Sequence, residues 1–329
     1  MSENKKEAPT FYGGQAVMEG VMMRGREHYC VSVRNPQGEI ESKMDVIKPA
    51  KWVDTLGKIP IIRGVVRLGS SMIVGMKVMK ASAEMAGLDD GVNEKEASKF
   101  DKWLERKFGD KLSNVLIIFA MVISLAFSVA LFMVLPTFLA GLLPLENYIW
   151  ARGIVEGLVR FAIFLGYIFL ISRLKDIQRV FEYHGAEHKV INCYEAGVEL
   201  TPENVKPFTR LHKRCGTSFL LFVMLISMIF FLFVRTDDMW LRLASRVLFV
   251  PFIAGISFEV IRWAGISDSF IVKVLSWPGF MLQKITTKEP DEEQIAVAIM
   301  ALEKVIEAEN RGKVQNEAIT VEALGQEQS

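Results

Sequence analysis

Apolar residues are concentrated in four long runs in the middle of the chain. Each run is close to, or longer than, the roughly 20 residues that an α-helix needs to cross the hydrocarbon core of a bilayer. Pro136 is expected to kink or end the first run, and Glu156 and Arg160 lie one helical turn apart in the second, where their charges can neutralise each other. The pattern predicts a mainly α-helical, polytopic membrane protein. Its membrane domain, residues 111–265, has expected spans at 112–143, 149–171, 216–234 and 241–264.

The first 110 residues are more polar and predict a small α+β region in the cytoplasm. Residues 29–47 contain two strand-like segments around Asn35-Pro-Gln-Gly38, a sequence typical of a type I turn, so a β-hairpin is expected there. Residues 59–86 have a helical pattern interrupted by basic side chains. This pattern favours an amphipathic helix that rests on anionic lipid or packs against the membrane domain. The sequence leaves open whether the helix enters the membrane.

A glycine-rich run, Gly13-Gly-Gln-Ala-Val-Met-Glu-Gly-Val-Met-Met-Arg-Gly25, precedes the hairpin. It contains the polar candidates Gln15, Glu19 and Arg24. A run of this kind can cradle a phosphate with its backbone N–H groups, but the spacing fits neither a dinucleotide-binding motif nor a P-loop. Tight turns and close backbone packing are therefore the favoured interpretation.

Two further helices are expected after the last span, within residues 266–310. Residues 270–282 are apolar but too short to cross a bilayer, so an interfacial helix is expected there. Pro290 and the acidic residues that follow it open an amphipathic helix that is expected to pack on the cytoplasmic region. Residues 311–329 are polar and are expected to form a disordered tail.

Composition and charge indicate which kinds of molecule the protein is expected to bind. The 329 residues are 51% hydrophobic, and 39 Lys and Arg balance 38 Asp and Glu. This balance indicates no acidic partner, so no nucleic acid is expected to bind, whereas membrane lipids are expected partners and a homo-oligomer is left open. Cys30, Cys193 and Cys215 are too widely spaced for a disulfide framework. The polar N-terminus does not have the pattern of a cleavable signal peptide.

The segment between the second and third spans, residues 172–215, is rich in positive charge. The turn near Pro144 is nearly uncharged, and the turn near Asp237 is mixed. By the positive-inside rule, the basic segment and both termini are expected to be cytoplasmic. Its basic residues are Arg173, Lys175, Arg179, Lys189, Lys206, Arg210, Lys213 and Arg214.

The same segment contains three of the four histidines, His184, His188 and His212. On a helix, His184 and His188 share one face with Glu187 beside them, in the His-x-x-Glu-His order of inverted zincins. Two imidazoles at this spacing can bind one divalent ion, and the carboxylate can be a further ligand or a general base. Asn192 can supply a supporting hydrogen bond. Buried, hydrogen-bonded histidines with Glu187 as their counter-charge are the structural alternative.

Several residues are candidates to complete this site. Glu195 lies on the same helical stripe, and His212 and Cys215 have donor atoms that suit zinc. Glu259 lies near the cytoplasmic end of the fourth span, where an ionisable group is commonly functional. A simple ion pair with Arg262 is the structural alternative for Glu259.

The end of the basic segment also predicts an anion site. A helix N-terminus with two cations beside it can bind a phosphate or a lipid headgroup. Positive-inside anchoring combined with helix capping explains the same residues equally well. The residues concerned are Lys213, Arg214, Gly216, Thr217 and Ser218.

Four motifs extend across nearly the whole chain: the run 13–25, His184-Gly-Ala-Glu-His-Lys189, Arg214-Cys-Gly-Thr-Ser-Phe219 and Glu259-Val-Ile-Arg262. With these motifs the sequence resembles the YqhQ-like family of bacterial multi-pass membrane proteins, which are described only as predicted metal-dependent enzymes. The resemblance implies a multi-pass protein of the bacterial cytoplasmic, or inner, membrane.

Two hypotheses for function follow. The first is a metal-dependent membrane enzyme, most simply a hydrolase, with His184 and His188 as ligands of a divalent metal and Glu187 as general base or further ligand; zinc is the expected metal. The second is a non-catalytic scaffold or anionic-lipid headgroup-binding protein in which the histidines are structural. A transporter is less favoured, because the sequence shows no internal repeat.

Overall fold

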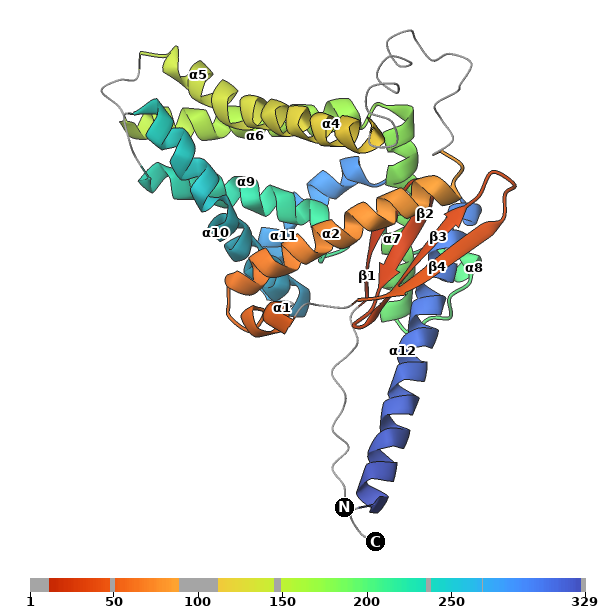
Figure 1. Cartoon of the computed structure of the whole chain (residues 1–329). Coiled ribbons are helices and arrows are strands. Elements are labelled where there is room, and N and C mark those ends of the chain that lie inside the picture. The colour runs from red at the N-terminus through yellow and green to blue at the C-terminus, as the bar shows by residue number, and fades with distance from the viewer. Residues whose placement is uncertain are drawn as a thin grey trace.

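The computed structural model describes residues 12–47, 51–88, 112–144, 149–234, 238–267 and 269–326. The remaining parts of the expected N-terminal region, and residues 327–329 of the expected tail, lie outside this described part. The described part has four strands in one sheet and is otherwise mainly helical (Figure 1).

The sheet is an antiparallel meander in the order β1-β2-β3-β4. The expected hairpin is present as β3 (His28–Arg34) and β4 (Ile40–Val46), joined by a turn in which Gly38 has φ 86°. The glycine-rich run forms a second hairpin, β1 (Gly13–Val17) and β2 (Gly20–Arg24). The sequence pattern did not predict this hairpin. Gly20 is required there, because an added Cβ would lie 2.2 Å from the carbonyl oxygen of Ser32.

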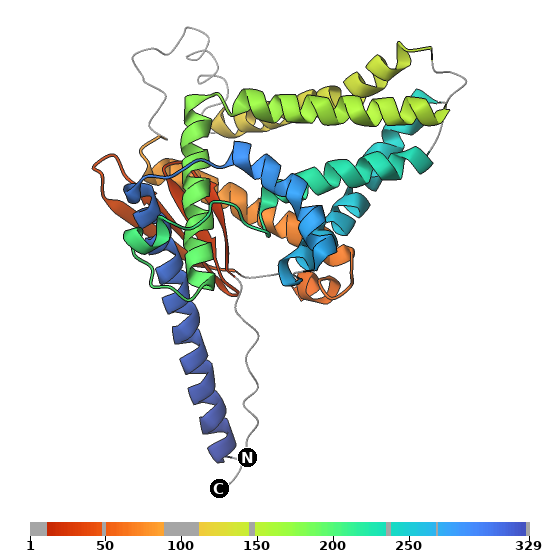
Figure 2. The ribbon, with the colours of Figure 1, turned by 180° about the vertical axis from the view of Figure 1, so that it is seen from behind.

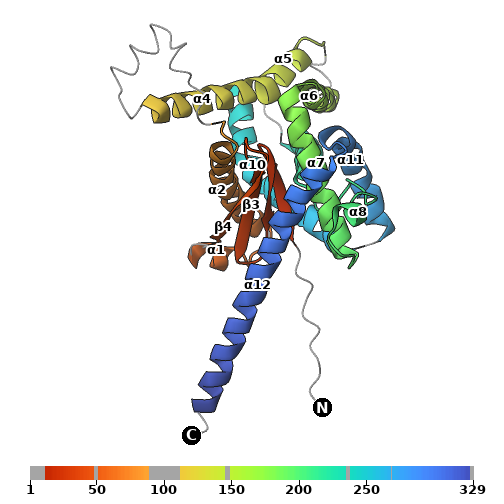
Figure 3. The ribbon, with the colours of Figure 1, turned by 90° about the vertical axis from the view of Figure 1, so that its right-hand side faces the viewer.

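Helices cover both faces of the sheet, as Figure 3 shows from the side. The amphipathic helix α2 (Ile62–Met85) lies on one face, and α7 (Lys175–Glu195) and α12 (Glu292–Gln326) lie together on the other (Figure 2). Alternate residues of each strand point to opposite faces: Val21 and Met23 join the core under α7 and α12, whereas Met22 joins the core under α2. The result is a three-layer arrangement that holds α7 rigidly against β1 and β2.

Within the part of the chain that the structure describes, four helical stretches are long and apolar enough to cross a membrane: Phe119–Gly141, Trp150–Ile171, Gly216–Phe233 and Ala244–Ile266. The first stretch covers the end of α4 (Leu112–Val129), a π-helical segment (Ala130–Val134) and α5 (Leu135–Gly141). The others belong to α6 (Ile149–Ile171), α9 (Gly216–Phe233) and α10 (Met239–Ile266). Most of their side chains face outward, as contact with lipid requires. The expected class, a mainly α-helical polytopic protein with a small strand-containing N-terminal region, is confirmed.

The first span does not end at Pro136. Instead, the π-helical segment precedes it and the helix continues to Gly141. Pro136 has no N–H to donate to the carbonyl of Phe132, four residues earlier. Nε of Arg160 donates to that carbonyl at 2.9 Å. The proline therefore creates an acceptor that a buried arginine of α6 uses.

Buried charges connect three of the apolar helices. Arg160 donates to Glu156 at 2.9 Å, as the sequence predicts, and Arg246 of α10 also pairs with Glu156. Thr137 of α5 donates to the same carboxylate at 3.0 Å. All three charged side chains are buried. One carboxylate between two guanidinium groups thus joins α5, α6 and α10.

The remaining helices link the sheet to the spans. α1 (Lys51–Leu56) precedes α2, which packs against α10 where an added Cβ on Gly64 would lie 3.0 Å from Cα of Gly255. α11 (Phe270–Thr286) packs against α9. The segment 172–215, expected as a loop between spans, is mostly helical, because it contains α7 and the short α8 (Pro202–Val205).

The C-terminal helix differs from its expected extent. Its first turns pack on the sheet and on α7 through Ile295, Ile299 and Leu302, in agreement with the apolar stripe in the sequence. However, α12 continues to Gln326, whereas residues 311–329 were expected to be disordered. The polar composition of this part is compatible with a helix that projects away from the sheet, as Figure 1 shows.

Candidate metal centre

α7 presents His184, Glu187 and His188 toward neighbouring elements rather than toward solvent. Gly185 explains how these elements come so close. An added Cβ on Gly185 would lie 2.0 Å from the carbonyl oxygen of Lys288, so only glycine lets the segment between α11 and α12 lie directly on α7. In this contact the N–H of Lys288 donates to the carbonyl of Phe181 at 2.9 Å.

Both imidazoles are oriented by backbone carbonyl groups. Nδ1 of His184 lies 2.9 Å from the carbonyl oxygen of Thr286, and Nδ1 of His188 lies 2.6 Å from that of Arg210. A carbonyl oxygen can only accept, so Nδ1 carries the proton in each ring and Nε2 keeps its lone pair. Metal-binding histidines are held in this way. Burial also lowers the pKa of His188, which favours the neutral form that can bind a metal.

Cys215 completes the group. Its Sγ lies 3.3 Å from Nε2 of His184, and the ligand atoms of His184, His188 and Cys215 all lie within 4.8 Å of one another. Cys215 is the N-cap residue of α9, where the N–H of Thr217 donates to Sγ at 3.4 Å. Cysteine binds metals through its sulfur atom.

Glu187 lies beside this group and is almost fully buried against β1. An added Cβ on Gly14 would lie 2.7 Å from Cγ of Glu187, so Gly14 is the residue that makes room for the carboxyl group. Burial raises the pKa of Glu187 to about 7, although the charge of His184 and a backbone hydrogen bond from Gly14 act in the opposite direction. A carboxyl group with this pKa can both accept and release a proton near neutral pH.

A small cavity of about 120 Å³ opens next to these side chains. Its lining includes Glu187, His188, His212 and Cys215. Tyr12 and Gly13, which precede and begin β1, form the opposite side. The cavity leaves space for a small group beside His188 and Cys215, two of the three ligand residues.

His212 and Glu195 do not belong to the ligand group of His184, His188 and Cys215. The backbone of His212 is fixed by Gln283, whose side chain accepts from its N–H at 2.8 Å and donates to its carbonyl at 2.9 Å. Glu195 pairs with Arg214 and lies 3.5 Å from Nε2 of His212. Burial alone would raise the pKa of Glu195, but hydrogen bonds from His212 and Arg214 lower it overall.

Asn192 supports the site as a positioning residue. Its Nδ2 donates to the carbonyl groups of Thr209 and Leu211 at 2.7 and 3.1 Å. These residues flank Arg210, whose carbonyl faces His188. Asn192 therefore fixes the segment that orients the second imidazole.

The residues proposed for an anion site at the start of α9 have other partners. Arg214 contacts Glu195, Thr217 contacts Sγ of Cys215, and the Ser218 hydroxyl accepts from Gln283 at 2.8 Å. Lys213 is exposed. The polar groups at the N-terminus of α9 therefore contact the Cys215 thiol and Gln283, which in turn binds the backbone of His212.

The other candidates lie away from the ligand group. Glu19, in the turn between β1 and β2, pairs with Arg179 of α7, and Gln15 faces Gly75 of α2. Arg24 reaches Ser71 of α2 at 3.5 Å. Glu259 pairs with Arg63, and Arg262 is a second partner at 3.8 Å. Among these, only Arg24 lines one of the described cavities.

Sequence reasoning did not identify Gly14, Gln283 or the carbonyl groups of Arg210 and Thr286 as parts of the site. Gly14 belongs to a run whose glycines were expected to permit close packing, and the contact between Gly14 and Glu187 agrees with that expectation. A backbone carbonyl has no sequence signature, so the two groups that orient the imidazoles could not be found from residue types.

Comparison with known proteins places this chain in a family. A family model described as "Protein of unknown function (DUF1385)" matches residues 59–308, which include His184, His188 and Cys215. The "Uncharacterized protein YqhQ" of Bacillus subtilis (strain 168) is 40% identical over 309 residues, covering 93% of this chain and 95% of that protein. The chain therefore belongs to the DUF1385 family, and its YqhQ-like character is confirmed. No solved structure matches it.

Proposed function

We propose that this protein is a metal-dependent membrane enzyme, most simply a hydrolase, with His184, His188 and Cys215 as the metal ligands. The observation that carries the proposal is the orientation of the two imidazoles. Each has Nδ1 at a backbone carbonyl, which leaves Nε2 for the ion, and the Cys215 thiol lies within reach of both. The approach of the ligand atoms of both histidines and of the thiol to within 4.8 Å of one another supports a metal site rather than a purely structural pair.

The donor set and its surroundings fit zinc. Two imidazoles and one thiolate are ligands that zinc accepts, and three protein ligands with an open fourth position are typical of catalytic rather than structural zinc sites. The cavity beside Cys215 and His188 supplies the space for that position. When bound there, a divalent ion supplies Lewis acidity.

Glu187 is the proposed general base. Glu187 lines the same cavity as His188 and Cys215, and its pKa of about 7 suits a group that takes a proton from a nucleophile and returns it to a leaving group. Gly14 and β1 exclude solvent from one side of the carboxyl group. In this proposal His212 and Asn192 position the segment 209–212 around the ligands.

The alternative function, headgroup binding by Lys213 and Arg214 around a structural histidine cluster, has weaker support. Arg214 is engaged by Glu195, and the hydroxyl and N–H groups at the start of α9 contact Cys215 and Gln283.

Metal content per chain tests the proposal. Full-length protein purified in an uncharged detergent is expected to contain near-stoichiometric zinc, measured by inductively coupled plasma mass spectrometry. His188→Ala removes one ligand and is expected to lose most of the metal, whereas His28→Ala, a matched substitution on β3 outside the ligand group, is expected to retain it. Glu187→Gln is expected to keep the metal but to lose hydrolase activity.

Two results would contradict the metal site: no metal in the wild type even after reconstitution with zinc, iron or manganese, or equal metal content in His188→Ala and His28→Ala. Size-exclusion profiles of the variants establish that they are folded. A wild type without metal would leave the histidines as buried structural groups, as in the alternative function.

We also infer that the protein lies in the bacterial inner membrane with the sheet, α7 and both termini in the cytoplasm. The basic residues of segment 172–215 support this orientation. In Figure 1 this segment lies beside the sheet, whereas the end of α5, the start of α6, the end of α9 and the start of α10 lie at the opposite end of the molecule. A green fluorescent protein fused after Ser329 is expected to fluoresce, and an alkaline phosphatase fused there is expected to be inactive. Active phosphatase would reverse the orientation.

A further inference from the structure

A second, larger cavity of about 610 Å³ lies between the sheet and α2. Its walls come from the end of β2 and the following turn, the connection between α1 and α2, the middle of α2, and Phe258 of α10. This volume is in the range of small-molecule sites and is too large for a single small ion. The metal centre proposed above does not use it.

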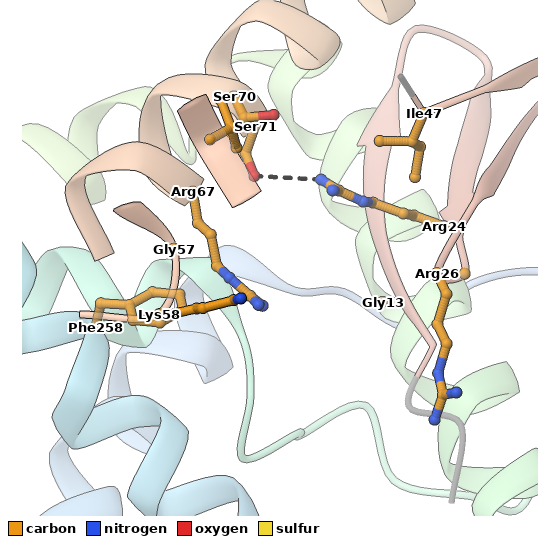
Figure 4. A pocket seen from close by; sticks show the side chains of 12 residues that line it. Gly13, Arg24, Arg26, Ile47, Gly57, Lys58, Arg67, Ser70, Ser71 and Phe258 are labelled. Carbon is orange, nitrogen blue, oxygen red and sulfur yellow. Dashed lines mark hydrogen bonds between the residues drawn. The ribbon is translucent and has the colours of Figure 1, made fainter. Parts of the chain in front are cut away.

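Positive charge dominates the lining. Arg24, Arg26, Lys58 and Arg67 are among the twelve described lining residues, and none of the twelve is acidic. Figure 4 shows Arg24 reaching from the sheet toward Ser71, while Arg67 and Lys58 reach toward the same space from the side of α2. The hydroxyl groups of Ser70 and Ser71 add donors between these cations.

The nearby carboxylates are engaged elsewhere. Glu309 of α12 contacts Gly25, but its Oε1 accepts from the N–H groups of Glu27 and His28 at 2.8 and 3.0 Å. Glu259, next to Phe258, pairs with Arg63. The described lining itself therefore carries four cations and no acidic side chain, and Glu309 lies at its edge beside Gly25.

The cations are held close enough to oppose one another. Arg24 is half-buried, and burial lowers its pKa, with the charge of Arg67 lowering it further. Like charges kept together at a cavity destabilise the unliganded protein. Guanidinium groups bind phosphate with paired, charge-assisted hydrogen bonds, so a phosphate group in the cavity would relieve this repulsion.

The surroundings of the cavity are apolar. Phe258 belongs to α10, one of the four candidate spans. An amphiphile with its charged end in the cavity could place its apolar part along α10 beside Phe258.

We propose that this basic cavity binds a phosphate ester, and that its position beside α10, one of the four candidate spans, makes an anionic phospholipid the carrier of that group. Arg24 and Arg67 bind the phosphate oxygens from opposite walls, with Lys58 and Ser71 as further donors. The site is separate from the ligand group of the metal centre, and the proposal does not depend on that centre being catalytic.

The test uses full-length protein in an uncharged detergent, with dihexanoyl-phosphatidic acid as the probe and isothermal titration calorimetry as the measurement. The wild type is expected to bind this lipid, and to bind dihexanoyl-phosphatidylcholine, which has the same chains but no net charge, at least about tenfold more weakly. Arg24→Gln and Arg67→Gln are each expected to weaken binding about tenfold, because each removes a charged hydrogen-bond donor.

Lys77→Gln is the matched control. It removes one positive charge from α2, but Lys77 does not line the cavity, so binding is expected to change less than about twofold. Glycerol 3-phosphate distinguishes the source of the phosphate. If it binds as tightly as phosphatidic acid and is lost in the same variants, the phosphate site stands but the lipid is overturned as its carrier.

Equal binding of both lipids, or an equal effect of Lys77→Gln and Arg67→Gln, would overturn the phosphate site itself. Metal content, measured on the same Arg24→Gln and Arg67→Gln samples, is expected to equal that of the wild type. This second measurement separates the two sites: loss of lipid binding with normal metal content supports the cavity, and a metal-free wild type that still binds phosphatidic acid refutes only the metal centre.

Discussion

Glu156→Gln is expected to destabilise the membrane domain by about 3–5 kcal/mol, the usual cost of removing one partner from a buried ion pair. The carboxylate of Glu156 lies between the guanidinium groups of Arg160 and Arg246, and all three side chains are buried among α5, α6 and α10. Without it, two positive charges remain in an apolar environment, where an uncompensated charge is most costly. The apparent melting temperature in detergent, followed by tryptophan fluorescence, is expected to fall by roughly 10 °C.

Glu84→Gln is the control for this substitution. Glu84 belongs to an exposed pair with Lys80 at 3.7 Å on α2, and exposed pairs of this kind contribute less than about 1 kcal/mol. A second comparison replaces all three buried charges with leucine, which is expected to recover most of the lost stability, since apolar replacements of a whole buried network are commonly tolerated. Equal melting temperatures for Glu156→Gln and Glu84→Gln would show that the network does not stabilise the bundle.

Gly185→Ala is the second substitution with a large expected effect. Its Cβ would lie 2.0 Å from the carbonyl oxygen of Lys288, which is backbone and cannot rotate away. The connection between α11 and α12 would have to move, at a cost of about 3 kcal/mol or more, at the upper end for overpacked sites. The same movement withdraws the Thr286 carbonyl from His184, so the variant is expected to lose metal affinity together with stability.

Gly166→Ala provides the matched comparison. Gly166 also lies inside a helix, α6, but an added Cβ there meets nothing within 4 Å. Alanine has the higher helix propensity, so this variant is expected to be as stable as the wild type or slightly more stable. If Gly185→Ala were as stable as Gly166→Ala, the close contact between α7 and Lys288 would not be required by the fold.

The membrane helices could be predicted from the sequence because the bilayer imposes both length and composition on them. The apolar stripe of α12 was equally clear, since Ile295, Ile299 and Leu302 recur at helical spacing and pack into the core. β1 and β2 were missed because glycines interrupt the alternation of Val17, Val21 and Met23, which is the usual sign of a strand. The π-helical segment before Pro136 was also missed, because its partner, Arg160, lies in another helix.

The candidate site was predictable only in part. The spacing of His184 and His188 identifies one helix face, but the choice among Cys215, His212 and Glu195 as a third ligand depends on where α9 begins relative to α7. The structure puts Sγ of Cys215 next to His184 and pairs Glu195 with Arg214. The sequence marked Arg24 and the basic helix 59–86 separately, but it could not predict the basic cavity, because Arg24, Lys58 and Arg67 come from segments that only the fold brings together.

The carbonyl that orients His184 belongs to a residue 102 positions later in the chain. Both α9 and α10 lie between the two, so the ribosome has produced the last two spans before Thr286 exists. During synthesis, the imidazole of His184 therefore has no final acceptor until α11 has been made, whereas the Arg210 carbonyl that faces His188 is produced earlier. In the proposed metal centre, loading would therefore be a late event in biogenesis, and a chain that stalls before α11 would carry the three candidate ligands without the carbonyl that orients His184.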